Sequence, residues 1–303
     1  MRFLALLLLT ASPLLSGCGA VAGGGGQGLS VVASFYPLQY VAQRIAGEEA
    51  DVTSLTAPGT EPHDAELSVS QTAEVVDADV LVYLSGFQPS VDDAVEQAGD
   101  AELVDAADSA DLVPLSEDAT AADPGTTSDG PVDPHFWLDP TRLAAVADDV
   151  ADALTEADPE HADIYAANAA ELHRDLASLD KDIARGLADC TLDTVVVSHN
   201  AFQYWALRYD LHMHAIAGLS PESEPSPEHV AELQELIRTD DITTVFSETL
   251  ASPKMAETLS SDLGLDTAVL DPVEGLSDDT AGEDYLSLMR RDLAALQEAN
   301  TCR

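Results

Sequence analysis

Basic residues are scarce in this chain of 303 residues, since Lys and Arg number 12 against 56 Asp and Glu, a formal net charge of −44. Such a surface repels the phosphates of nucleic acids and anionic lipid headgroups, so we expect no nucleic-acid partner. It attracts cations without selecting among them. Because the carboxylates are spread along the predicted helices, we interpret most of them as a solvated surface.

Long apolar runs are also scarce, and the one at the N-terminus, FLALLLLTASPLL, is too short for an ordinary membrane span. It follows Arg2 and ends in LSGC, which resembles the bacterial lipobox. The glycine-rich stretch behind it is typical of a flexible tether. We therefore expect a signal peptide at 1–17, lipid attachment at Cys18 and a tether over 18–28. Cleavage at another small residue is the alternative.

Only two further cysteines are present, Cys190 and Cys302. They form an even pair in a chain that we expect to be exported, so a disulfide is possible. Cys190 follows the longest predicted helix and Cys302 follows the last one. We predict a disulfide between them, with two separate thiols as the alternative.

Strand and helix signals alternate along most of the chain. In the first part we predict strands at 29–35, 51–57 and 79–85 and helices at 37–47 and 65–78. The pattern blurs over 88–131, and a helix then starts at the Asp-Pro step 139–140. In the second part we predict strands at 194–199, 211–218, 242–248 and 266–271, and helices at 201–210, 227–240, 253–264 and 283–300.

A long helix is predicted from Pro159, because apolar residues recur there at steps of three or four. They are Ile164, Leu172, Leu176, Leu179, Ile183 and Leu187. About 28 residues at ~1.5 Å each span roughly 40 Å, the length of a two-lobed molecule. We therefore expect an α/β fold with two parallel-sheet lobes, at 29–158 and 189–303, joined by one long helix at 159–188.

Candidate metal ligands occur where such a fold places its binding sites. His63 lies in a loop beyond a strand, while His199 and Asp271 stand at the carboxyl ends of TVVVS and TAVL. In open parallel sheets, ligands bind outside these strand ends. His135 stands between two Asp-Pro steps in VDPHFWLDP, before two aromatic residues that suggest a fixed side chain. The spacing alone does not distinguish a shared metal site from scattered histidines with structural roles.

The other histidines are weaker candidates. His161, His173 and His229 lie on predicted helices among charged neighbours, so we interpret them as surface residues. His212 and His214 are two apart on a predicted strand and share a face, but no third ligand is near them in sequence.

Five segments, in order PGTEPHD, DPHFWLDP, VSHNAF, GLSPESEPSP and VLDPVEGL, resemble the zinc and manganese solute-binding lipoproteins of bacterial ABC transporters. The similarity to these TroA-like receptors extends from about Ser30 to the C-terminus. It implies two α/β lobes joined by a rigid helix, one divalent metal between them and an ABC permease as partner. It also implies four ligands: His63, His135, His199 and Asp271, with Glu248 or a water molecule as the alternatives to Asp271. The histidine-rich loop of many zinc members is replaced by an acidic segment at 116–131.

The residue at the third ligand position indicates the metal. In the resembling family a histidine there, as at His199, goes with zinc and a carboxylate goes with manganese. The chemistry agrees, since imidazole suits Zn²⁺ whereas carboxylate and water suit Mn²⁺.

We therefore expect a monomeric, extracytoplasmic Zn²⁺ receptor, anchored to the cell membrane as a lipoprotein, that delivers zinc to an ABC permease and is not an enzyme. A manganese receptor is the alternative within the family. Outside it, the alternatives are a zinc hydrolase, with Glu248 as its base, and an adhesin that acts without metal.

Overall fold

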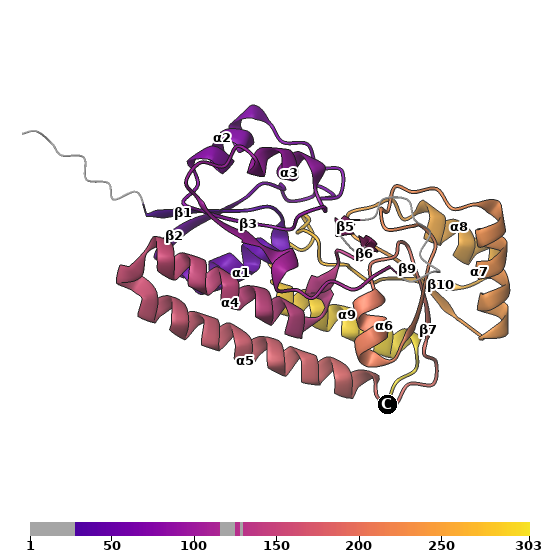
Figure 1. The fold of residues 1–303 in the computed structure, drawn as a ribbon. Coiled ribbons are helices and arrows are strands. Elements are labelled where there is room, and N and C mark those ends of the chain that lie inside the picture. The colour runs from indigo at the N-terminus through magenta and orange to yellow at the C-terminus, as the bar shows by residue number, and fades with distance from the viewer. Residues whose placement is uncertain (1–27, 116–124, 128–129) are drawn as a thin grey trace, which may run out of the picture.

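The computed structural model describes residues 28–115, 125–127 and 130–303 (Figure 1). The expected signal peptide, Cys18, nearly all of the tether and most of the acidic segment 116–131 lie outside these residues. The predictions for them therefore stay predictions. Among the described residues, no helix combines the length and the apolar character needed to cross a membrane.

The first lobe is a parallel four-stranded sheet with helices on both faces. Its strands, in the order β2-β1-β3-β4, are β1 Leu29–Ala33, β2 Ala50–Ser54, β3 Val80–Tyr83 and β4 Glu102–Asp105. Its helices are α1 Tyr36–Ala46, α2 Val69–Asp77, α3 Pro89–Val95 and α4 Pro140–Ala157. Figure 1 shows α2 and α3 on one face of the sheet and α1 and α4 on the other. The central strands β1 and β3 are apolar because both of their faces are covered.

The second lobe repeats this plan. Its parallel strands, in the order β10-β9-β7-β8, are β7 Thr194–Val197, β8 His212–Ala215, β9 Thr244–Ser247 and β10 Asp266–Val269. Its helices are α6 Gln203–Tyr209, α7 Pro227–Thr239, α8 Lys254–Leu263 and α9 Tyr285–Ala299. The strands and helices predicted for both lobes are present, with ends that differ by a few residues. The two-lobed parallel α/β fold is confirmed, while the exact lobe boundaries stay predictions.

The region 88–131, where the sequence pattern blurs, contains helix α3 and strand β4 of the first lobe. Helix α3 has only seven residues, and β4 is a four-residue edge strand in which only Val104 is buried. The short antiparallel pair of β5 Gly125–Thr127 and β6 Gly130–Val132 follows. Elements this short carry too few apolar residues to show a period.

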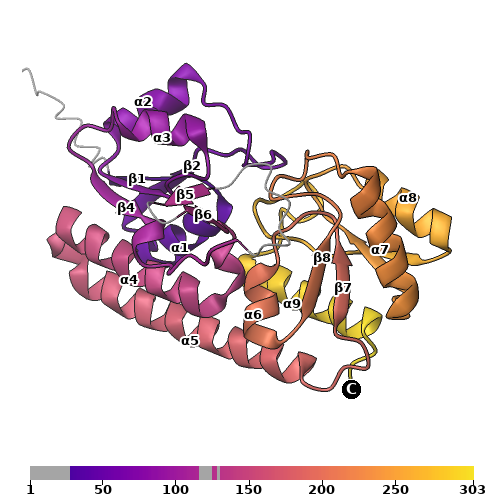
Figure 2. The same ribbon diagram turned by 45° about the vertical axis from the view of Figure 1, so that its right-hand side comes forward.

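The linking helix α5, Ala162–Leu187, follows a 3₁₀ turn at Pro159–His161 and runs beneath both lobes in Figures 1 and 2. Its buried face begins at Tyr165 and includes Leu172, Leu179 and Leu187. Ile164, predicted on this face, is instead 40% exposed. The reason is the direction in which the side chains point around the helix axis. Between Ile164 and Leu172 the helix turns ~80° beyond two full turns, whereas between Tyr165 and Leu172 it ends only ~20° short of two turns.

A disulfide joins Cys190 and Cys302, as predicted, although they are 112 residues apart in sequence. It connects the segment after α5 to the end of the chain after α9. Beside it, the backbone N–H groups of Thr191 and Leu192 donate to the carbonyl oxygen of Asn300. The base of the second lobe is thus fastened both covalently and by hydrogen bonds.

The two lobes are bonded to each other through the segment that follows His135, the 3₁₀ turn η2 Phe136–Leu138. The Trp137 indole N–H donates to the carbonyl oxygen of Pro272, at 2.7 Å, in the second lobe. The hydroxyl of Tyr285, on α9, donates to the carbonyl oxygen of Trp137. Since these groups are buried, each bond satisfies atoms that have no access to water.

Candidate metal centre

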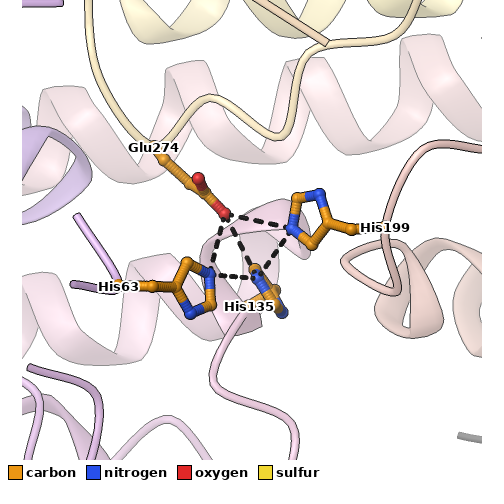
Figure 3. A group of neighbouring side chains, drawn as sticks. All are labelled: His63, His135, His199 and Glu274. Carbon is orange, nitrogen blue, oxygen red and sulfur yellow. Dashed lines mark hydrogen bonds and ion pairs between the residues drawn. The ribbon is translucent and has the colours of Figure 1, made fainter. Parts of the chain in front are cut away.

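Four buried side chains converge between the lobes: His63, His135, His199 and Glu274 (Figure 3). His63 comes from the loop after β2, and His135 immediately precedes η2. His199 follows β7, and Glu274 lies in the loop after β10. Two ligand candidates thus come from each lobe, at the ends of strands where parallel sheets place their ligands.

Five of the six distances between the four facing atoms are similar. The Nε2 of His135 lies 3.3 Å from the Nε2 of His63 and 3.4 Å from that of His199. The Glu274 Oε1 lies 3.4, 3.2 and 3.4 Å from the Nε2 atoms of His63, His135 and His199. The remaining pair, His63 and His199, stays within 4.8 Å.

These spacings fit a tetrahedral zinc ion. In a regular tetrahedron with edges of this length, the centre lies roughly 2.0–2.1 Å from each corner, which is the usual length of Zn–N and Zn–O bonds. The buried Glu274 Oε1 has no hydrogen-bond partner of its own among the described residues. A cation at the centre would complete its coordination.

Carboxylates orient two of the imidazoles from behind. The Asp133 Oδ1 lies 2.7 Å from the Nδ1 of His135 and also accepts the backbone N–H of His135. Asp133 therefore supplies the fixed acceptor that a metal-bound imidazole needs, which the sequence did not reveal. The Glu248 Oε2 lies 2.7 Å from the Nδ1 of His199. With the Nδ1 proton of His135 directed to Asp133, its Nε2 presents a lone pair to the centre. At His199 the approach of Glu248 is an ion-pair contact without hydrogen-bond geometry.

The same carboxylates shift the pKa values of these two histidines. Burial lowers the pKa of His135, but the carboxylates of Asp133 and Glu274 outweigh burial and the net shift is upward. At His199 burial is again outweighed, here by Glu248 and Glu274, and the pKa rises well above its usual value. These upward shifts favour the protonated imidazoles, so a metal must compete with protons for the same nitrogens.

The pKa values of the other two members of the converging group, His63 and Glu274, are lowered. Burial lowers the pKa of His63, which favours the neutral imidazole that a metal binds. Burial raises the pKa of Glu274, but the three histidines outweigh it and hold that pKa well below the usual value. Nearby, burial and the charge of Glu274 raise the pKa of Glu61 to about 7. Glu274 is thus the ionised carboxylate of the centre.

Asp271, which the sequence indicated as the fourth ligand, lies outside this group. Its Oδ1 accepts the backbone N–H of Val273, and its Oδ2 accepts from Thr249 and Arg291. Sequence reasoning missed Glu274, three residues further along the segment VLDPVEGL. The segment does contain this second acidic residue, but only the turn between Asp271 and Glu274 shows which of the two carboxylates faces the histidines.

The remaining histidines are away from the centre. His161 lies close to Asp158 and Glu49, and His173 to Asp148, all in partly exposed positions. The His229 Nε2 lies 2.8 Å from a backbone carbonyl oxygen. His212 is exposed and His214 half-buried, and neither belongs to the converging group.

Comparison with known proteins agrees with this centre. The family model described as zinc-uptake complex component A, periplasmic (ZnuA), matches residues 31–299. The chain belongs to the ZnuA family. Membership covers both lobes and includes every residue of the converging group.

Similar proteins carry names that refer to zinc binding or zinc uptake. The chain is 36% identical over 279 residues to the zinc-binding lipoprotein AdcA of Streptococcus pneumoniae, with 89% of this chain and 55% of AdcA covered. It is 32% identical over 282 residues to the high-affinity zinc uptake system protein ZnuA of Bacillus subtilis, with 90% and 88% covered. The chain thus spans about half the length of AdcA and most of the length of the Bacillus protein.

Solved structures share the fold. Zn(II)-bound AdcA from Streptococcus pneumoniae superposes with a TM-score of 0.75 at 34% identity, covering 90% of this chain and 58% of that one. The laminin-binding protein Lmb of Streptococcus agalactiae, a bifunctional protein with adhesin and metal transporting activity, superposes with a TM-score of 0.78 at 28% identity, covering 90% of this chain and 99% of that one.

Proposed function

We propose that this protein is an extracytoplasmic receptor that captures Zn²⁺ between its two lobes and delivers it to an ABC permease. The observation that carries the proposal is the set of three imidazole nitrogens and one carboxylate oxygen, 3.2–3.4 Å apart in five of six pairs. Four protein ligands at tetrahedral spacing suit a bound zinc ion. Family membership and the zinc-binding relatives support the same conclusion.

Zinc is favoured over manganese by the donor set. Three of the four donors are imidazoles, which suit zinc, whereas manganese prefers oxygen donors and six-coordinate sites. Mn²⁺ is also the weakest binder in the divalent series. A receptor with these ligands distinguishes zinc from manganese by the type of donor atoms and by the number of coordination positions that it offers.

An enzymatic role has little support in the site. A catalytic zinc keeps one coordination position open and a base nearby, but here the protein supplies four donors. Glu248, the one candidate base from the sequence, is engaged by both His199 and Ser198. We therefore propose a binding protein and not a hydrolase.

Attachment to the membrane is proposed from the N-terminal sequence. A lipid on Cys18, followed by the glycine-rich tether, would keep a monomeric receptor close to its permease. Mass spectrometry of the mature N-terminus tests this, because lipidated Cys18 is expected and an unmodified N-terminus at another residue would refute it.

Metal content and competition titration test the function itself. Protein purified without added metal should contain zinc, and the metal-free protein should bind one Zn²⁺ per chain in competition with a chelator. Zinc should bind more tightly than manganese. Tighter manganese binding, or no tight binding of either metal, would refute the proposal.

A further inference from the structure

The carboxylate of Asp271 is buried beside the metal centre without facing it. Its Oδ1 accepts the backbone N–H of Val273 at 2.8 Å, two residues ahead, which closes a turn. Its Oδ2 accepts from the Thr249 hydroxyl and lies 3.4 Å from an Arg291 nitrogen. Its own backbone N–H donates to the buried Asp292. Both carboxylate oxygens and the backbone N–H of Asp271 are therefore engaged in shaping the loop.

The turn that Asp271 closes contains an unusual backbone conformation. Val273 has φ of 56°, in the left-handed region. A β-branched side chain is disfavoured there, and such strain persists only where the surroundings enforce it. The next residue is Glu274, whose Oε1 faces the three histidines. The strained residue thus directly precedes a metal-ligand candidate.

The first lobe supports the same turn from two sides. The Trp137 indole N–H donates to the carbonyl oxygen of Pro272, and the Gly59 backbone N–H donates to that of Leu276. Trp137 lies two residues after His135, and Gly59 four residues before His63. The loop that carries Glu274 is therefore placed relative to the histidines of the opposite lobe.

We propose that Asp271 is a positioning residue, which enforces the left-handed turn at Val273 and so fixes the Glu274 carboxylate as a single-oxygen zinc ligand. This inference rests on the proposed function. A carboxylate released from the turn can move away or bind through both oxygens, leaving room for water. More oxygen donors and a higher coordination number favour manganese. Asp271 thereby contributes to metal selectivity without touching the metal.

Competition titration of metal-free protein with Zn²⁺ measures the effect of Asp271→Ala. We expect zinc affinity to fall about 10- to 100-fold, the usual loss when a group that orients a metal ligand is removed. Asp271→Asn should retain most of the affinity, because the amide oxygen can still accept the Val273 N–H. Asp279→Ala is the matched control, since it removes an exposed carboxylate from the same loop. Thermal unfolding of each metal-free variant verifies folding.

Two double variants separate positioning from direct binding. In the Glu274→Ala background, Asp271→Ala should cost less than about 3-fold, because the residue acts through Glu274. Adding Val273→Gly to Asp271→Ala should recover much of the affinity, since glycine adopts the left-handed conformation without strain. The pair with Val273→Gly remains informative if Asp271→Ala alone folds poorly.

Co²⁺ supplies a spectroscopic readout of geometry. Four-coordinate Co²⁺ absorbs visible light strongly, and six-coordinate Co²⁺ weakly. The unmutated protein should give the strong spectrum, Asp271→Ala a weaker one, and Asp271→Ala with Val273→Gly a restored one. A purely structural loss of folded protein would lower metal occupancy without changing the spectrum per bound ion.

The outcomes are distinct. An unmutated protein that does not bind zinc refutes the proposed function together with this inference. Zinc binding that Asp271→Ala leaves unchanged refutes the inference alone. A loss of equal size in the Glu274→Ala background would show that Asp271 binds the metal itself, and would also overturn the positioning role.

Discussion

Replacing Glu248 by Gln should change how zinc affinity depends on pH. The Glu248 Oε2 lies 2.7 Å from the Nδ1 of His199, and its Oε1 accepts from the Ser198 hydroxyl. Glutamine has nearly the same shape and can keep both contacts with its oxygen and its amide. The substitution therefore removes the negative charge while leaving the imidazole oriented.

Two consequences of the lost charge oppose each other. The imidazole becomes a weaker donor, which should lower the limiting affinity about 10- to 100-fold, or roughly 1.4–2.7 kcal/mol. However, Glu248 is also a cause of the raised pKa of His199, so its removal lowers that pKa. Fewer protons then compete with zinc near neutral pH.

The sign of the pH effect follows from this competition. In the unmutated protein, zinc affinity should fall as pH falls through the raised pKa of His199, about tenfold per unit for that one proton. In Glu248→Gln this decline should begin at a lower pH. The difference between the two proteins should thus be largest in alkaline solution and shrink on acidification.

Competition titration with Zn²⁺ at a series of pH values measures both curves. Asp262→Asn, an exposed carboxylate on α8, is the control for charge and should follow the unmutated curve. A constant difference at all pH values, or one that grows on acidification, would refute the reasoning. Equal affinities in alkaline solution would show that Glu248 does not support His199.

Three further predictions concern the ligands, the cargo and the disulfide. His63→Ala, His135→Ala and Glu274→Ala should each weaken zinc binding strongly in competition titration, while His173→Ala, on the surface, should not; unchanged binding in any of the first three would remove that residue from the ligand set. Removing zinc with a chelator should lower the melting temperature, since free zinc at 100 times its Kd stabilises the fold by about 2.7 kcal/mol; equal melting temperatures would contradict binding to the folded state. Cys190→Ser should lower the free energy of unfolding in denaturant titration by up to roughly 4–5 kcal/mol, the chain-entropy limit for a loop of ~110 residues; an unchanged free energy would show that the bond adds nothing.

The three histidines of the centre could be predicted because each stands at a position defined locally. His199 follows the buried strand β7, and His135 lies between two Asp-Pro steps. Asp133 could also have been identified, because a carboxylate two residues before a histidine can accept both its N–H groups. The sequence singles out Glu248 by its place at the end of a predicted strand, but its contact with His199 depends on the pairing of β7 and β9.

Glu274 shows why the fourth member of the converging group escaped the sequence. Asp271 comes sooner after its strand, so the strand-end rule favours it. The choice between the two carboxylates depends on the left-handed backbone at Val273, a conformation that the residue type disfavours. It also depends on hydrogen bonds from Trp137 and Gly59 in the other lobe. No local propensity encodes contacts between segments so far apart.

X-ray absorption at the zinc edge, on protein loaded with one equivalent of Zn²⁺, tests the central claim most directly. The structure predicts four nitrogen or oxygen neighbours at about 2.0–2.1 Å, three of them imidazoles. His199→Ala should remove one imidazole contribution and leave those of His63 and His135. Five or six neighbours at longer distances, or a spectrum that His199→Ala leaves unchanged, would contradict the zinc centre described here.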